Sequence, residues 1–280
     1  MGRRYYITDV FATGPYSGNQ LATVVDTEGV TAAEMQQIAR AFNFAETTFV
    51  TGGDLQAGFD VRIFTPVAEL PFAGHPTLGT AYLLRHEIHS IKADVLTLNL
   101  GVGKIPVEFA ADGVLWMNQI QPTFKAGPNK ATAASYLGLD ESDLMGDFNP
   151  QYVSTGLEFL LVPLVNLDAL QRCRGVQTEV PVLAFTTQGY NEQFDISARM
   201  FAGELGVSED PATGSANGCL AAYLCEHALL GKNEAKVTVA QGFEIGRPSA
   251  LFLDAHKQAD NFTIRVGGRV NLVSTGEWCL

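Results

Sequence analysis

The feature that most constrains the fold of this chain is an internal repeat. Its spacing is about half of the 280 residues. The sequence offset between matching residues is 141 at four points, which pair 81–83 with 222–224, His86 with His227, 96–98 with 237–239 and Gly101 with Gly242. Before these points the offset is 140 between Gly74 and Gly214, and 135 between the Phe-Asp (FD) pairs at 59–60 and 194–195. A constant offset through helical and extended segments predicts two related halves.

Each half contains one segment that predicts a buried helix. A tight loop around Gly74 leads into the first, from about Pro76 to Arg85, and a Gly-Ser turn at 214–215 leads into the second. Both are apolar or small on nearly every side, and such a helix must be surrounded by protein. Because strand-like segments flank both helices, we expect an α+β fold. It has two pseudo-symmetric halves, each a barrel-like curled sheet around a central apolar helix.

The boundary between the halves is expected near the segment NQIQPTF. Residues 1–118 then form the N-terminal half and 119–269 the C-terminal half. The tail at about 270–280 is a candidate for completing the first half.

One further helix is well marked at its ends. Thr31 and Glu34 form a capping box at the start of TAAEMQQIARAF. Asn43 is expected to end this helix in the left-handed conformation. Glu46 then lies where the chain turns from the helix into the strand TTFV.

Composition excludes several classes of function. The net charge of −12 and the lack of any Lys/Arg cluster argue against nucleic-acid binding. No apolar run reaches the ~18–20 residues that a membrane-spanning helix needs. The four cysteines are scattered without a CxxC pair, which suggests a reducing cytoplasm and no disulfide framework or zinc site. No motif for a metal, a flavin or pyridoxal is present, so no cofactor is expected.

The two glycine turns suggest a site for an acidic small molecule. Related domains usually face one another across a pseudo-twofold axis, so we expect both helix N-termini to point into one inter-domain cleft. Free backbone N–H groups there can hold a carboxylate without Lys or Arg. Gly74 and Gly214 would let a ligand approach the backbone closely. His75, Asp210 and Ser215 add polar groups with transferable protons.

Four segments resemble the PhzF family of phenazine biosynthesis-like isomerases. They are DVFATGPYSGNQLATVV, FNFAETTFV, RIFTPVAELPFAGHPTLGTAYLL and GVSEDPATGSANGCLAAYL, and the resemblance covers nearly the whole chain. It implies a diaminopimelate epimerase-like fold, a homodimer, and proton transfer by a carboxylate. The site residues it implies are Glu46 as acid/base, His75, Asp210 and Ser215 as its companions, and Asn19, Gly74 and Gly214 for substrate binding.

These inferences lead to a cofactor-independent isomerase or epimerase. We expect Glu46 to move a proton on a small carboxylic acid in the inter-domain cleft. Two alternatives stay open, a cysteine-dependent amino-acid racemase and a non-catalytic carboxylate-binding module of the same fold. Diaminopimelate epimerase uses one cysteine at each helix start, and the matching positions here are Gly74 and Gly214. Because Cys219 lies five residues inside the second helix, the racemase is disfavoured.

Overall fold

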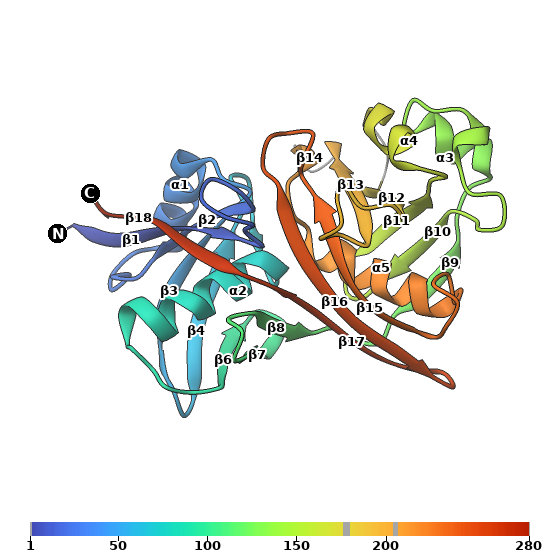
Figure 1. Cartoon of the computed structure of the whole chain (residues 1–280). Coiled ribbons are helices and arrows are strands. Elements are labelled where there is room, and N and C mark those ends of the chain that lie inside the picture. The colour runs from blue at the N-terminus through green and yellow to red at the C-terminus, as the bar shows by residue number, and fades with distance from the viewer. Residues whose placement is uncertain (1, 176–179, 204–206, 280) are drawn as a thin grey trace. The chain divides into compact units, whose positions relative to one another are not determined.

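The computed structural model describes residues 2–175, 180–203 and 207–279. The chain divides into two compact units (Figure 1). The first comprises residues 1–117 and 268–280, and the second residues 118–267.

The first unit is a mixed sheet with two α-helices. β1 is antiparallel to β2, which is parallel to β3, and β3 is antiparallel to β4. β4 is antiparallel to β5 and parallel to β6, and β6, β7 and β8 follow in antiparallel order. The elements are β1 (Arg3–Val10), β2 (Asn19–Val24), α1 (Ala32–Phe42), β3 (Glu46–Asp54), β4 (Gly58–Phe64), β5 (Glu69–Leu70), α2 (Gly74–Leu83), the π-helical turn η1 (Leu84–Ile88), β6 (Val95–Leu100), β7 (Gly103–Phe109), β8 (Leu115–Asn118) and β18 (Val270–Trp278).

The second unit repeats this order of pairing from β10 to β16. β10 is antiparallel to β11, β11 is parallel to β12, and β13 is antiparallel to β12 and β14 but parallel to β15. β15, β16 and β17 are antiparallel neighbours. The elements are β9 (Thr123–Ala126), α3 (Lys130–Ser135), the 3₁₀ turn η2 (Glu141–Asp143), β10 (Gln151–Ser154), β11 (Glu158–Pro163), α4 (Leu167–Arg172), β12 (Val182–Thr186), β13 (Ile196–Ala202), β14 (Val207–Asp210), α5 (Gly214–Glu226), β15 (Glu234–Gln241), β16 (Ser249–Gln258) and β17 (Asn261–Gly268).

The two repeats exchange their last strands. β18 follows the second repeat in the sequence, yet it pairs antiparallel with β1 along eight residues in the first unit (Figure 1). β9 follows the first repeat and pairs with β10 in the second unit. Each unit is therefore completed by a strand that lies outside its own repeat in the sequence.

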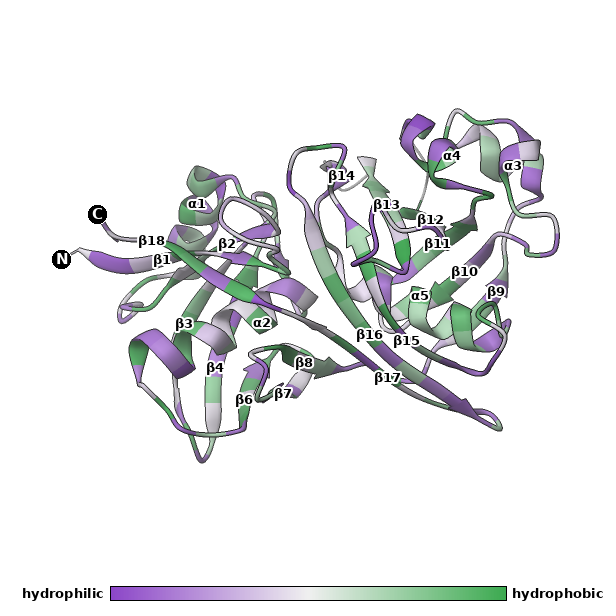
Figure 2. Ribbon diagram, viewed as in Figure 1, coloured by the Kyte–Doolittle hydropathy of each residue, from purple (hydrophilic) through white to green (hydrophobic). Residues whose placement is uncertain are grey.

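The two central helices are enclosed by strands, which confirms the predicted fold class. α2 contacts β1, β2, β3, β6, β7 and β18, and α5 contacts β10, β11, β15 and β16. Every residue of α5 from Gly214 to Cys225 is buried, and Figure 2 shows this helix mostly in hydrophobic colours. Strands on several sides leave no face of either helix for a polar stripe.

The first central helix begins two residues earlier than predicted. Gly74 and His75 are its first two residues, and Ala73, in an extended conformation, is the N-cap. Pro76 does not interrupt the helix because N–H groups of the first turn have no intrahelical partner to lose. The α-helix ends at Leu83 and continues as the π-helical turn.

The predicted capping of α1 is confirmed at both ends. Thr31 Oγ1 accepts a hydrogen bond from the Glu34 N–H at 3.3 Å, and Glu34 Oε2 accepts from the Thr31 N–H at 2.8 Å. Asn43 has a φ of 55° and donates its N–H to the Ala39 carbonyl. The buried face consists of Met35, Ile38 and Ala39.

The repeated FD words are not equivalent positions. Phe59 pairs with Leu98, whereas Val239, which lies 141 residues after Leu98, pairs with Ile196. Phe59 therefore corresponds to Ile196, and the word match to Phe194 was wrong by two residues. In strands whose apolar and polar residues alternate, similar short stretches recur every two residues, so a two-letter match can be shifted by two positions.

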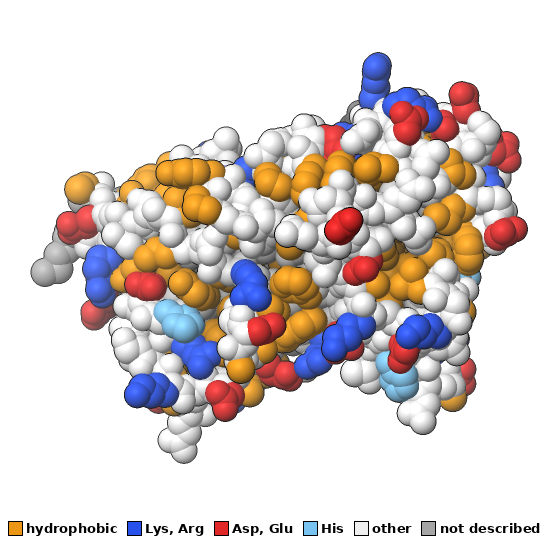
Figure 3. All heavy atoms as spheres, in the orientation of Figure 1, with side chains coloured by type: hydrophobic (Ala, Val, Ile, Leu, Met, Phe, Trp, Pro, Cys, Tyr) orange, Lys and Arg blue, Asp and Glu red, His pale blue; other side chains and the backbone are white. Residues whose placement is uncertain are grey.

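The charged side chains of the surface are mixed on the face that Figure 3 draws. On the face drawn in Figure 3, Lys and Arg side chains lie among acidic and uncharged ones. Within residues 2–175, 180–203 and 207–279, no helix is long and apolar enough to cross a membrane.

Close packing of α2 against β1 and β2 predicts that Gly79→Ala destabilises the protein. An added Cβ would lie 2.6 Å from Leu21 Cδ2 and 2.9 Å from Val10 Cγ2, both on buried strands. We expect the overpacking to outweigh the gain in helix propensity and to lower the free energy of unfolding by about 1–3 kcal/mol. Urea unfolding measures this. Gly14→Ala is the control, because no atom lies within 4 Å of its added Cβ, and equal stability of the two variants would contradict the prediction.

Candidate active site

The first unit brings Glu46 and His75 together. Glu46 is the first residue of β3 and pairs with Leu21 of β2, and His75 is the second residue of α2. Glu46 Oε2 lies 3.4 Å from His75 Nε2, and the exposed fractions of the two side chains are 16% and 6%. A carboxyl group and an imidazole are thus juxtaposed at the start of a buried helix.

His75 is held in its neutral form. Burial lowers the pKa of His75 from 6.5 to about 3, and a hydrogen bond with the Gln20 backbone opposes this only in part. Nε2 is buried and makes no hydrogen bond to the part of the chain that the structure describes, so the bond to Gln20 falls to Nδ1. A neutral ring that donates from Nδ1 has only a lone pair at Nε2. The atom that faces Glu46 is therefore a proton acceptor.

The other predicted residues of this unit lie at the same end of its sheet. Asn19 is buried and is the first residue of β2, whose parallel neighbour β3 begins at Glu46. Gly74 is the first residue of α2, whose N-cap, Ala73, makes no side-chain hydrogen bond to the helix. Backbone N–H groups at this N-terminus are thus free of a side-chain cap and available to an anion.

The second unit brings Asp210, Gly214 and Ser215 together. Asp210 is the last residue of β14, and Gly214 and Ser215 are the first two residues of α5. Asp210 and Ser215 are both buried. The N-cap, Thr213, again makes no side-chain hydrogen bond to the helix, and its hydroxyl donates instead to Asp210 Oδ2.

Strand pairing shows which of these residues are equivalent in the two units. Gly74 and His75 correspond to Gly214 and Ser215, the first two residues of each central helix. The two acids have no acidic counterparts. From the pairs Ile63–Leu70 and Met200–Asp210, the position of Asp210 is occupied by Leu70. From the pairs Thr47–Phe64 and Val182–Phe201, the position of Glu46 is occupied by Pro181.

Cys219 has the properties of a packing residue. It is fully buried, with Sγ 3.6 Å from Thr155 Oγ1, and burial raises its thiol pKa to about 11. The thiol is therefore neutral at pH 7. Burial likewise raises the pKa of Cys173 to about 12 and that of Cys225 to about 11.

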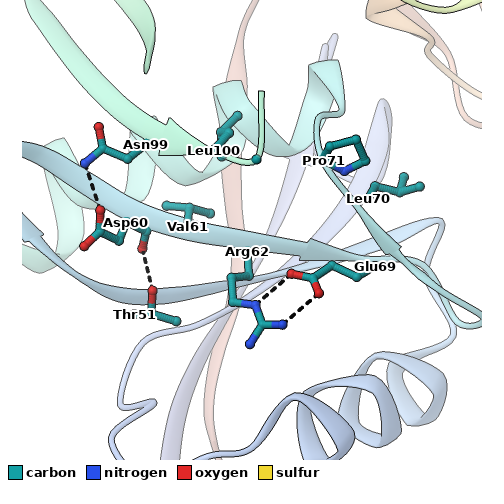
Figure 4. A pocket seen from close by; sticks show the side chains of 10 residues that line it. Thr51, Asp60, Val61, Arg62, Glu69, Leu70, Pro71, Asn99 and Leu100 are labelled. Atoms are coloured by element: carbon teal, nitrogen blue, oxygen red, sulfur yellow. Dashed lines mark hydrogen bonds and ion pairs between the residues drawn. The ribbon is translucent and has the colours of Figure 1, made fainter. Parts of the chain in front are cut away.

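A pocket elsewhere in the first unit is distinct from this site. Its volume is about 500 Å³, and its lining includes none of the predicted site residues. Figure 4 shows its polar side chains paired with one another. Arg62 donates two hydrogen bonds of 2.7 Å to Glu69, and Asn99 donates one of 2.8 Å to Asp60.

No metal centre is seen in the described ranges, which hold no group of three or more His, Cys, Asp or Glu residues suited to bind an ion.

Sequence reasoning missed three residues that orient the site, namely Gln20, Thr213 and Gln241. Gln20 acts through its backbone, which forms a hydrogen bond with the His75 ring. Thr213 lies inside the segment EDPATGSAN, but the sequence does not show that its hydroxyl points to Asp210, because that direction is set by the turn before α5. Gln241 lies 31 residues after Asp210 in the sequence, and its side chain donates to the Asp210 carbonyl at 2.8 Å. No sequence pattern signals that contact.

Burial of neutral His75 predicts a pH-dependent stability. Between pH 6.5 and about 3 the unfolded chain binds a proton at this residue and the folded chain does not. Stability is therefore lost as the pH falls through this range, by up to about 1.4 kcal/mol per pH unit. Urea unfolding of wild type and His75→Gln at pH 7, 5.5 and 4 should show the steeper loss in the wild type. Parallel pH dependences would contradict the neutral assignment.

The chain matches a known protein family over almost its whole length. The family model described as phenazine biosynthesis-like protein (PhzC-PhzF) matches residues 8–276. The trans-2,3-dihydro-3-hydroxyanthranilate isomerase of Pseudomonas fluorescens is 36% identical, over 94% of this chain and 95% of its own length.

Solved structures agree with this match. A phenazine biosynthesis protein of the PhzF family from Bacillus anthracis superimposes with a TM-score of 0.91 over the full length of both chains, at 29% identity. A hydroxyproline epimerase from Agrobacterium vitis has a TM-score of 0.59 over 100% of this chain and 93% of its own, at 10% identity. The second likeness is one of fold alone.

Proposed function

The chain belongs to the PhzC-PhzF family of phenazine biosynthesis-like proteins and is an isomerase, and we propose that it moves a proton between carbon atoms of a small carboxylic acid. In this proposal Glu46 removes the proton from one carbon and returns it to another while a double bond shifts. Atoms and charge are conserved, so the step requires no cofactor. The observation that carries the proposal is the pair of half-buried Glu46 and buried, neutral His75, whose Oε2 and Nε2 atoms lie 3.4 Å apart.

Two properties of this pair suit proton transfer. Glu46 is largely shielded from water, which strengthens its interactions with a bound substrate. His75 presents a lone pair towards it and so can accept a hydrogen bond from the protonated carboxyl group. The arrangement thus supports a glutamate that alternates between base and acid.

The unequal acids of the two units favour isomerisation over racemisation. A racemase that works from both faces of a carbon needs an acid and a base on opposite sides. In the repeat, Glu46 corresponds to Pro181 and Asp210 to Leu70, so no matched acid pair exists at these positions. A single acid that both removes and returns the proton suits the transfer of that proton from one carbon to another within the same molecule.

The uncapped helix starts are proposed to hold the substrate. The backbone at Gly74 and at Gly214 would bind the carboxylate and the developing negative charge. Asp210 and Ser215 are proposed to serve the same substrate, with Asn19 as a further binding residue. Because the Pseudomonas fluorescens relative is named for trans-2,3-dihydro-3-hydroxyanthranilate, cyclic dienyl carboxylic acids are the first class to test.

The homodimer and the cytoplasmic location remain predictions. The first rests on the family resemblance and is tested by sedimentation equilibrium. The second rests on the free cysteines.

Replacement of Glu46 tests the proposed chemistry. In D₂O, wild type should place deuterium on a carbon of the substrate, and Glu46→Gln should lower turnover by about 10²–10⁴-fold, because general acid–base catalysis is lost. NMR of trans-2,3-dihydro-3-hydroxyanthranilate and related acids measures both. Glu28→Gln, at an exposed position, is the matched control. A folded Glu46→Gln variant with normal turnover would contradict the assignment of Glu46. Wild-type protein that binds the test acids but places no deuterium on them would favour the non-catalytic binding module.

Replacement of Cys219 tests the thiol alternative. Because this thiol is buried and neutral at pH 7, we expect Cys219→Ala to keep its activity within about threefold of wild type. The assay is the same NMR turnover measurement, with circular dichroism to verify folding. Loss of turnover in a folded variant would revive the cysteine-dependent racemase.

A further inference from the structure

We infer that Thr213 and Gln241 are positioning residues that keep Asp210 Oδ2 as a hydrogen-bond acceptor, an inference that rests on the proposed function of Asp210. The residues concerned are Asp210 at the end of β14, Thr213 at the N-cap of α5, Asn217 in the first turns of α5, and Gln241 at the end of β15. Their side chains form a continuous chain of hydrogen bonds. The argument depends on the direction in which each bond is donated.

Two backbone carbonyl groups fix the orientation of both side-chain amides. Asn217 Nδ2 lies 3.0 Å from the carbonyl oxygen of Thr213, and Gln241 Nε2 lies 2.8 Å from that of Asp210. A carbonyl oxygen only accepts, so both side-chain atoms must be NH₂ groups. Gln241 Oε1 is then the atom that accepts from Asn217 Nδ2, at 2.8 Å. All these contacts agree on one assignment.

The direction of the remaining bonds follows from that assignment. Gln241 Nε2 also lies 3.2 Å from Thr213 Oγ1, and an NH₂ group can only donate. The Thr213 hydroxyl therefore accepts from Gln241 and has its single proton left for Asp210 Oδ2. Asp210 Oδ2 is therefore the acceptor in its bond with Thr213.

This network is not required by the fold. Gln241 and Asn217 are fully buried, and burial of amide groups is unfavourable unless they are hydrogen-bonded. The first unit has the same strand pairing around its central helix without the network. There, Asp210, Thr213, Asn217 and Gln241 are replaced in order by Leu70, Ala73, Thr77 and Leu100.

One of the four positions has the same structural role in both units. Thr77 Oγ1 donates to the Ala73 carbonyl at 2.7 Å, just as Asn217 donates to that of Thr213. The bond at the helix start is thus common to both units. The part specific to the second unit is the link from Gln241 through Thr213 to Asp210. Its presence only beside the acid indicates a role in orienting that acid.

The test compares Thr213→Val with Thr213→Ser and with Thr77→Val as the matched control in the first unit. Isomerisation of the substrate found in the deuterium assay gives kcat, KM and the pH–rate profile. We expect Thr213→Val to lower kcat by at least about tenfold, with little change in KM, because the acid is mispositioned. The acidic limb of the profile should move to higher pH, because the carboxylate has lost a donor. Thr213→Ser should restore both, and Thr77→Val should change neither.

A second variant guards against misfolding of Thr213→Val. Gln241→Glu keeps the shape of the side chain but removes the NH₂ group that donates to Thr213, so it should also lower kcat and move the acidic limb. Wild-type kcat and profile in folded Thr213→Val or Gln241→Glu, while Asp210→Asn is inactive, would overturn this inference alone. Full activity of Asp210→Asn would instead overturn the proposed role of Asp210, and this inference with it.

Discussion

The nearly complete burial of the two central helices is the constraint on which the rest of this structure depends. A helix without a polar face cannot lie on the surface, so strands must enclose it. Enclosure also removes water from the first turn, whose N–H groups have no partner in the helix. In α2 and α5 that turn carries glycine and no side-chain cap. The same burial that stabilises each unit therefore places a helix start without an N-cap side-chain hydrogen bond beside the polar residues of the candidate site.

The local features of the fold could be predicted because they depend on residues close together in the sequence. The capping box of Thr31 and Glu34 spans one turn, and Asn43 ends the helix through its own backbone conformation. The position of Glu46 at a helix-to-strand junction followed from the same short-range signals, and the structure places it as the first residue of β3. Two buried helices about 140 residues apart were enough to indicate the repeated architecture.

The features that escaped prediction depend on distant contacts. The FD words misled because equivalence in a sheet is set by register, which Leu98 and Val239 reveal only once the strands are paired. Gln241 could not be connected with Asp210, because its amide reaches that residue only when β15 lies beside the turn after β14. For the candidate site, the residues were suggested by the two glycine turns and by the family resemblance, whereas their hydrogen-bond directions required coordinates.

The exchange of terminal strands has a consequence for how the protein is made. During synthesis β1 is made long before its partner strand β18, because the whole second repeat lies between them in the sequence. Until then one edge of β1 has no strand beside it and is open to pairing with other chains. The second unit, by contrast, has both β9 and β10 available before its central helix is made. The C-terminal strand thus acts as a late closing segment, and a chain that stops short of it would leave the unit that carries Glu46 unfinished and prone to aggregate.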